Sequence, residues 1–329
     1  YGWGLGMDTH KPLMGLVMPR VMSGMFNKPV KEIRSEEPLS ILGANLVELE
    51  DDMLTVKSEP IRILPALNNA PKGSALREHS FFEAASLRKF GDLYYFIYSS
   101  HVNHELCYAT SKYPNRDYTY RGVIISNGDI GINGRKPKDR LYPTGTNHGS
   151  IEYINGQYYI FYHRQTHNTA FSRQACAEPI TIEPDGTIRQ VEITSCGLNG
   201  GPLKAEGKYP ATICCNLTNG KMPHLSNVRK NPPSPNVELR FIKDITKGTM
   251  IGYKYFSFSD TTRLKVTYRG SGGDLKILIG EKQMGILQLP TAKNWAESNE
   301  TTLNVSGTHA LYFIYHGSGK IDLLDFTFG

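Results

Sequence analysis

Two segments of the chain share one pattern, in which a turn is followed by a run of aromatic and β-branched residues. They are residues 91–99 and 156–163, where Tyr94 and Tyr158 hold matching positions 64 residues apart. Runs of this composition that follow a glycine turn are typical of β-strands. A repeat of this length that is built from strands, with no helical stretch between them, predicts neighbouring blades of a β-propeller.

A polar residue stands shortly before each of these two strands. Glu83 lies in the segment 81–84, and His148 lies in the segment 147–150. The blades of a propeller surround a central channel. Both residues fall where the innermost strand of a blade would face that channel, so we expect the chemistry at the channel mouth.

The pattern changes after the glycine-rich segment 197–202, which has the composition of a linker. Short strands are predicted beyond it at 238–242, 249–258, 263–269, 274–279, 285–288, 301–305, 309–315 and 321–328. About eight strands at short, regular spacing predict a β-sandwich. We therefore expect an all-β protein with a propeller portion in residues 1–202 and a sandwich in residues 203–329.

The first 40 residues differ from the rest of the chain. Five methionines, at positions 7, 14, 18, 22 and 25, lie in a segment rich in glycine and proline. Because methionine fills irregular gaps, we expect a long insertion or an irregular loop here. The regular pattern begins near residue 45, where 46–49 and 54–56 are predicted to be paired strands with a turn at Asp51 and Asp52.

Composition and charge exclude several classes of partner. The net charge is +6, but the basic residues are spread along the chain, which indicates a solvated surface and argues against nucleic acid. No apolar run reaches the ~18 residues of a membrane span, so no membrane partner is expected. The five cysteines lack metal-ligand spacing and should be reduced and mostly buried, with Cys214 and Cys215 on a strand and facing opposite ways. No signal peptide is visible, which leaves cytoplasmic and secreted locations both open.

Several motifs resemble known carbohydrate-active proteins. Residues 81–89, 94–100, 147–152, 162–164 and 172–176 resemble glycoside hydrolase family 43, and residues 201–329 are similar to the jelly-roll sandwich of carbohydrate-binding module family 6. The first resemblance implies a five-bladed propeller, which at about 60 residues a blade needs close to 300 residues. Residues 1–202 supply about three blades.

That shortfall leads to two expectations for the propeller. Either the N-terminal blades are missing, in a fragment or a truncated gene product, or the protein is divergent and closes differently. Unpaired strand edges readily pair with other chains, so an incomplete propeller is expected to self-associate.

Glu83 is the position that the resemblance assigns to the general acid. Such an acid must be protonated at the working pH, and we expect Phe81 and Phe82 to favour that form by excluding water. The alternative is an ordinary glutamate on an exposed strand. The family inverts stereochemistry, which requires a second carboxylate roughly 6.5–9.5 Å away as the base. The resemblance implies two aspartates besides Glu83, one that acts as this base and one that tunes the acid. The motif of neither aspartate is found in this chain.

The resemblance also implies residues that contact the substrate in the propeller portion. His148 matches an axial histidine that holds a water molecule or, through water, a central cation. Arg173 matches a position that reaches the sugar beside the acid. Arg164 and His163 are weaker candidates of the same kind, and Phe82 is a further candidate for substrate binding. His79, four residues before Glu83, is a candidate neighbour at the channel rim. A surface salt bridge is the alternative role for either arginine.

In the sandwich, aromatic faces are the candidates for stacking on a sugar ring. Trp295 is preferred over Tyr253 and Tyr255, because aromatic residues on strands are usually part of the core. Sandwich modules of this kind often hold a structural calcium, and Glu206 and Asp325 are candidate ligands. No organic cofactor is expected.

These inferences favour a glycosidase with an arabinoxylan-type oligo- or polysaccharide as its partner. It would remove α-L-arabinofuranosyl or β-xylosyl residues from plant hemicellulose by inverting hydrolysis. Galactofuranosidase activity on the same scaffold is one alternative. Another, of a different class, is a non-catalytic glycan-binding protein or an inactive fragment, because the base is not found.

Overall fold

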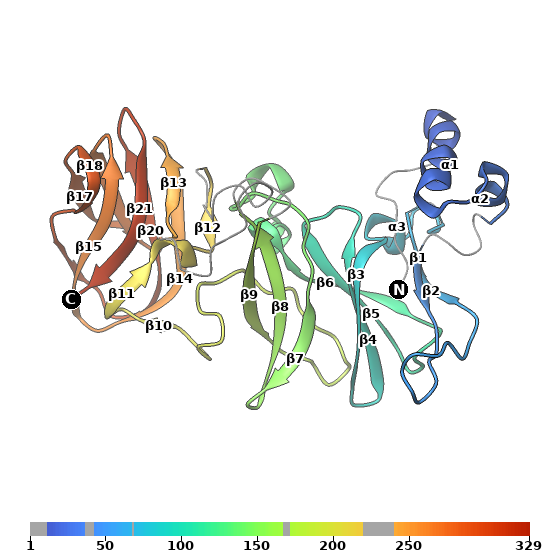
Figure 1. Cartoon of the computed structure of the whole chain (residues 1–329). Coiled ribbons are helices and arrows are strands. Elements are labelled where there is room, and N and C mark those ends of the chain that lie inside the picture. The colour runs from blue at the N-terminus through green and yellow to red at the C-terminus, as the bar shows by residue number, and fades with distance from the viewer. Residues whose placement is uncertain (1–11, 37–42, 68, 167–171, 220–239) are drawn as a thin grey trace. The chain divides into compact units, whose positions relative to one another are not determined.

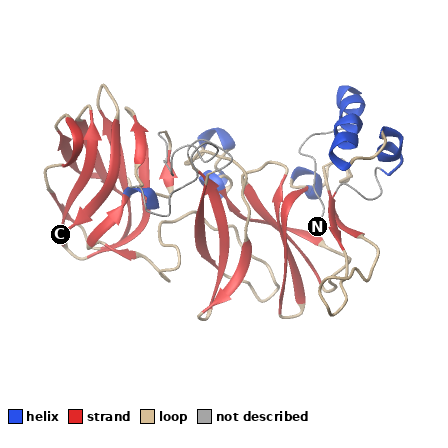
Figure 2. Ribbon diagram, viewed as in Figure 1, coloured by secondary structure: helices blue, strands red, loops and turns tan. Residues whose placement is uncertain are grey.

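The computed structural model describes residues 12–36, 43–67, 69–166, 172–219 and 240–329. Strands dominate these residues (Figure 2), which confirms the predicted all-β class. None of the helices in these ranges has the length and apolar character needed to cross a membrane.

The N-terminal segment corrects the prediction of an irregular loop. Helix α1 (Pro12–Phe26) and helix α2 (Val30–Glu36) form here (Figure 1). Leucine and methionine are good helix formers, and only one proline, Pro19, lies inside α1. The prediction gave the glycines and prolines more weight than the helix formers between them.

The first strands form a small antiparallel sheet. Strand β1 (Gly43–Leu46) pairs with β2 (Ile61–Pro65). Of the hairpin predicted for residues 46–49 and 54–56, the structure shows a single bridge and its turn. Leu49 forms a bridge with Val56, and the Glu50 amide donates to the Thr55 carbonyl across the turn at 2.8 Å.

Two larger sheets follow. The short helix α3 (Ala75–Glu78) leads into a four-stranded sheet in the order β3 (Phe81–Phe90), β4 (Leu93–Ser100), β5 (Glu105–Ser111) and β6 (Thr119–Ser126). The predicted polar loop near 126–146 holds three 3₁₀ turns, at Asn127–Asp129, Ile132–Gly134 and Pro137–Asp139. A three-stranded sheet comes next, in the order β7 (Ser150–Ile154), β8 (Gln157–Gln165) and β9 (Arg173–Ile180).

The 64-residue repeat corresponds to a contact between these two sheets. Ser86 on β3 and Ser150 on β7 share a hydrogen bond of 2.8 Å. Arg88 and Glu152, also 64 positions apart, form an ion pair of 2.7 Å. The first strands of the two sheets therefore lie side by side with repeat-equivalent residues in contact. This is the arrangement expected of adjacent propeller blades, and it confirms that prediction.

The C-terminal part is a sandwich of two sheets, as predicted. One sheet has the order β10 (Leu203–Lys204), β14 (Met250–Phe258), β20 (Gly307–His316), β16 (Gly273–Ile279) and β17 (Lys282–Leu289), with β12 (Asn216–Leu217) on β14. The other has the order β11 (Gly207–Pro210), β21 (Ile321–Phe328), β15 (Thr261–Gly270) and β18 (Ala292–Glu297), with β13 (Ile242–Ile245) on β21 and β19 (Thr301–Asn304) on β15. The core between the sheets contains many aromatic residues, including Tyr253, Phe256, Phe313 and Phe326.

Two details of this region differ from the predictions. Strand β18, which carries Trp295, was not predicted, because its polar residues had no clear alternation. The short strands β10, β11 and β12 were not predicted either. Cys214 and Cys215 are not on a strand. Cys214 caps the 3₁₀ turn Ala211–Ile213, and both thiols are buried. All five cysteines are free, as expected, but Cys176 and Cys196 are only half-buried.

The chain folds as two compact units. The first takes in the residues up to Ile125 with Thr146–Tyr162 and Ile180–Gln190, and the second takes in Ser126–Gly145, His163–Pro179 and Val191–Gly329. Segments that precede residue 202 thus associate with the sandwich. The predicted domain boundary after residue 202 stays a prediction.

Candidate active site

A distortion of strand β3 determines where the Glu83 side chain points. Phe81 lies opposite Ser100, Glu83 opposite Ser99 and Ser86 opposite Ile97, so the register shifts on both sides of Glu83. Ala84 has a φ of 62°, a left-handed conformation that is uncommon for a residue with a side chain. Bulges of this kind change the direction of side chains and occur often beside functional sites.

The two phenylalanines before Glu83 do not shield it together. Phe81 is fully buried and packs against Phe96 and Tyr98 in the core of the blade. Phe82 is half-buried. The expectation that both rings would exclude water from the carboxyl group is therefore wrong for Phe81, because it faces the core.

The side chain that meets Glu83 is His148. Its Nε2 atom lies 2.9 Å from Oε1 of Glu83, and the two side chains are 33% and 28% exposed. The structure therefore brings together the two polar residues that the repeat had placed at the channel. The shared proton can sit on the imidazole beside a carboxylate, or on the carboxyl group beside a neutral imidazole. In either state, the second carboxyl oxygen of Glu83 takes no part in the hydrogen bond with His148.

Gly149 makes this approach possible. A Cβ atom at this position would lie 1.8 Å from the carbonyl oxygen of Phe161 on β8. Because that atom belongs to the backbone, a side chain here would push the loop that carries His148 away from β8. In the sequence, the Asn-His-Gly motif indicated the position of His148. The motif did not reveal that the Phe161 carbonyl leaves room only for a glycine at position 149.

The predicted arginines belong to the second compact unit. Arg164 is only 2% exposed, donates to Gln174 Oε1 and to the Thr212 carbonyl, and lies over the Tyr142 ring. This burial argues against the predicted contact between Arg164 and a sugar. Arg173 is exposed, and one of its terminal nitrogens lies 3.3 Å from Nε2 of His163. Its contact with substrate stays a prediction.

The aromatic candidates in the sandwich differ in exposure. Tyr253 is fully buried, and the Tyr255 hydroxyl donates to Glu192. Trp295 is half-buried, with the Phe241 ring against it at a centroid distance of 5.2 Å. The guanidinium group of Arg269 lies over the Trp295 ring at 4.4 Å. A cation therefore covers one face of the preferred stacking platform.

The two calcium candidates do not form one donor set. Glu206 is 71% exposed and pairs with Lys204, whereas Asp325 is buried and pairs with Lys208. Asp325 lies opposite Pro210 on β11, and Glu206 precedes the other end of that strand, so about 13 Å of strand separates the two positions. This separation argues against an ion that both residues share. His148 offers only an imidazole nitrogen, and calcium prefers oxygen ligands.

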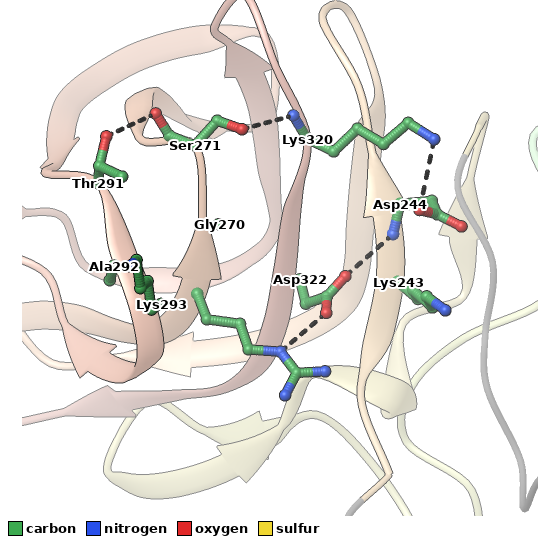
Figure 3. Close-up of a pocket in the computed structure, with 10 residues that line it drawn as sticks. Lys243, Asp244, Gly270, Ser271, Thr291, Ala292, Lys293, Lys320 and Asp322 are labelled. Carbon is green, nitrogen blue, oxygen red and sulfur yellow. Dashed lines mark hydrogen bonds and ion pairs between the residues drawn. The ribbon is translucent and has the colours of Figure 1, made fainter.

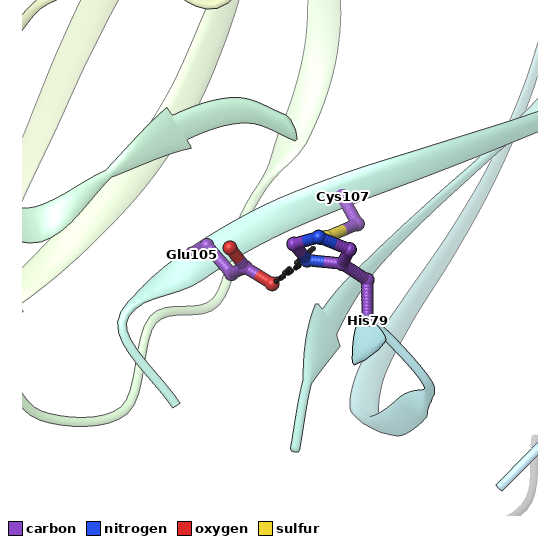
Figure 4. Close-up of side chains that lie close together, drawn as sticks. All are labelled: His79, Glu105 and Cys107. Carbon is purple, nitrogen blue, oxygen red and sulfur yellow. Dashed lines mark hydrogen bonds and ion pairs between the residues drawn. The ribbon is translucent and has the colours of Figure 1, made fainter. Parts of the chain in front are cut away.

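A buried cluster of titratable groups was not predicted. His79 Nδ1 lies 2.6 Å from Oε1 of Glu105, which also accepts hydrogen bonds from Ser100 Oγ and Cys107 Sγ (Figure 4). The hydrogen bond to Glu105 raises the pKa of His79. Burial alone would raise the pKa of Glu105, but the hydrogen bond and charge of His79 outweigh it and lower that pKa. His79 is thus a partner of Glu105, and its predicted place beside Glu83 has no support.

The same cluster has ligand types that metal ions use. The ligand atoms of His79, Glu105 and Cys107 all lie within 4.8 Å of one another. Burial raises the pKa of the Cys107 thiol well above its ordinary value, so it keeps its proton. Each group already has a hydrogen-bond partner, and the cluster is best described as a network that ties α3 to β5.

Comparison with known proteins finds similarity to enzymes named xylosidase/arabinosidase and arabinoxylan arabinofuranohydrolase. No protein-family model matches it. A xylosidase/arabinosidase of Thermoclostridium stercorarium is 42% identical over 301 residues, which are 87% of this chain and 63% of that protein. An arabinoxylan arabinofuranohydrolase of Bacillus subtilis is 22% identical over 272 residues, covering 75% of this chain and 50% of that protein. The chain thus spans less than two thirds of these relatives' length.

The chain is also similar to two kinds of solved structure, an enzyme and a carbohydrate-binding module. A glycoside hydrolase family 43 arabinoxylan arabinofuranohydrolase from Bacillus subtilis, in complex with cellotetraose, matches 86% of this chain and 58% of that chain, with a TM-score of 0.44 and 21% identity. A family 6 carbohydrate-binding module from Clostridium cellulolyticum, in complex with xylose, matches 38% of this chain and 98% of that chain, with a TM-score of 0.32 and 16% identity.

Proposed function

We propose that the chain is a glycosidase of glycoside hydrolase family 43 with Glu83 as its general acid, because its motifs resemble that family and it is 42% identical to a xylosidase/arabinosidase. The resemblance read from the Glu83 and His148 motifs agrees with the name of this relative. The proposed substrate is hemicellulose of the arabinoxylan type, from which α-L-arabinofuranosyl or β-xylosyl residues are removed. The proposed reaction is a single displacement with inversion.

The Glu83–His148 pair is the observation that carries the proposal. A general acid must hold a proton and deliver it to the leaving oxygen. Glu83 is on a rigid strand, is partly open to solvent and has one oxygen engaged by His148 at 2.9 Å. We assign His148 the role of a positioning residue, which fixes the rotamer of the carboxyl group and leaves the second oxygen to face the substrate.

We assign no residue of the described part of the chain to the general base. Inverting hydrolysis places the base roughly 6.5–9.5 Å from the acid, with a water molecule between them. A general base contributes about 10²–10⁴-fold to the rate. The proposal therefore concerns the general acid only. The experiment has to measure the contribution of Glu83 to the rate independently of the base.

Leaving-group dependence is that test. An acid is needed most when the leaving group is a poor one, such as the sugar in xylobiose, and least when it is 2,4-dinitrophenolate. We expect Glu83→Gln to lower kcat/KM about 10²–10⁴-fold on xylobiose or an arabinoxylan oligosaccharide, and far less on dinitrophenyl glycosides.

Glu152→Gln is the matched control, because Glu152 lies on the first strand of the neighbouring sheet, β7, but pairs with Arg88 at the surface. It should leave both kcat/KM values near those of the wild type. Equal losses for Glu83→Gln on both classes of substrate would refute the acid role. Absence of turnover by folded wild-type protein would favour the glycan-binding alternative.

A further inference from the structure

The sandwich carries a cavity of about 440 Å³ whose charged lining residues are mostly basic (Figure 3). It is formed at the ends of strands β13, β15, β18 and β21. The charged residues that line it are Lys243, Asp244, Arg269, Lys293, Lys320 and Asp322. Four cations and two anions give this small volume a positive balance, so it favours a ligand with negative charge.

The acidic groups are already engaged. Asp322 accepts from Nε of Arg269 at 2.9 Å and from the Asp244 amide at 3.1 Å. Asp244 in turn pairs with Lys320 at 3.5 Å. Lys243 and Lys293 have no acidic partner among the described residues and are exposed. Two ammonium groups of the lining are thus available to a ligand.

Arg269 is held as a fixed anion receptor. Its Nε atom is bound to Asp322, and its guanidinium plane lies 4.4 Å from the Trp295 centroid and 4.8 Å from that of Phe241. Stacking on aromatic rings keeps the guanidinium oriented and weakly hydrated. Its two terminal nitrogens have no acceptor within the described part of the chain. A planar fork of this kind matches the geometry of a carboxylate.

The rim of the cavity is made rigid by its backbone. Thr291 Oγ1 donates to the Ser271 carbonyl at 3.0 Å, and the Ser271 amide donates to the Lys320 carbonyl at 2.9 Å. Gly270 has a φ of 130°, and a Cβ atom there would lie 2.3 Å from the Lys320 carbonyl oxygen. These contacts hold the backbone of the rim in place.

We propose that this cavity binds a sugar that bears a carboxylate, a uronic acid, as part of the glycan. The carboxylate would lie on Arg269 and between Lys243 and Lys293, and the hydroxyls of the ring would meet the hydroxyl and aspartate oxygens of the rim. A compact, highly charged anion such as phosphate is less suited, because it would face the two aspartates. In this arrangement Trp295 orients Arg269 rather than stacking on a neutral sugar. The choice of a glycan rests on the proposed function.

Calorimetric titration of the full chain with acidic and neutral oligosaccharides tests the proposal. The Glu83→Gln chain is used so that no ligand is hydrolysed. The ligands are xylotriose with one glucuronate branch, unbranched xylotetraose, and trigalacturonate. We expect the branched acidic ligand to bind at least 10-fold more tightly than xylotetraose, with an affinity that falls as salt rises from 50 to 500 mM.

The double variant Lys243→Gln with Lys293→Gln should weaken binding of the acidic ligand about 10-fold and leave xylotetraose unaffected. Both side chains are exposed, so folding should not change. Lys282→Gln, on β17 of the other sheet, is the control and should have no effect.

Equal binding of acidic and neutral ligands, or no effect of the double variant, would overturn the proposal. Preference for trigalacturonate would support the carboxylate site and indicate pectin as the source of the acidic sugar. The hydrolysis assay of the wild type is independent, so each hypothesis can fail without the other.

Discussion

Replacing Gly149 by alanine should disable the Glu83–His148 pair while leaving both side chains in the protein. The added Cβ would lie 1.8 Å from the Phe161 carbonyl oxygen, where real Cβ atoms essentially never come closer than 3.0 Å. Ser150, the next residue, pairs directly with Phe161 in the β7–β8 ladder. The clash partner is therefore backbone, and the loop has to move by more than 1 Å.

A shift of this size exceeds what the pair can absorb. The contact between His148 and Glu83 is 2.9 Å long, and hydrogen bonds weaken steeply beyond ~3.5 Å. Forcing atoms into a packed site costs about 1–3 kcal/mol of the free energy of unfolding. A misplacement of ~1 Å at catalytic groups can lower the rate by about 10². We expect both losses in Gly149→Ala.

The control is a glycine at the other end of the same strand. Gly156 has a φ of 86°, and a Cβ atom there would have no neighbour within 4 Å, so alanine meets strain but no clash. Gly156→Ala should lose about 1–2 kcal/mol of stability and keep its kcat/KM. Urea unfolding and kcat/KM on an arabinofuranoside, corrected for folded fraction, measure both quantities. Equal kcat/KM values for the two variants would refute the reasoning.

Three further predictions concern buried charges. Lys254→Met should lower the free energy of unfolding by roughly 3–5 kcal/mol, because Asp129, 2% exposed, loses the ammonium group 2.8 Å away. Adding Asp129→Asn should recover much of this loss in a double-mutant cycle. Additive losses from the two substitutions would contradict the pairing. The pKa of His79 is raised and that of Glu105 is lowered, so their pair stabilises the fold fully between the ordinary values of 4.5 and 6.5. That stabilisation is lost as pH rises through the pKa of His79 or falls through that of Glu105. His79→Gln should lower Tm within this window and flatten the dependence of Tm on pH outside it, and an unchanged profile would count against the pair. Arg164→Leu should lower stability by about 1.5–3 kcal/mol through lost hydrogen bonds, and a change in KM without a change in Tm would instead favour sugar contact.

The sequence alone was sufficient for the features that depend on local patterns. Seven strands of the sandwich, β14 to β17 and β19 to β21, were predicted to within about three residues at each end, because alternation along a strand reflects which face meets the core. The 64-residue repeat identified two neighbouring sheets, and motif resemblance singled out Glu83 and His148. All of these signals lie within short stretches of chain, where the side-chain pattern and the backbone conformation are directly linked.

Tertiary structure alone decided how distant residues meet. The bulge at Ala84 and the backbone beside Gly149 bring Glu83 and His148 into contact, and neither leaves a mark in a periodic pattern. The same holds for the pairing of His79 with Glu105, the burial of Arg164 and the stacking of Arg269 on Trp295. Each depends on strands that are far apart in the sequence, whose register is set by packing of the whole sheet rather than by the residues themselves.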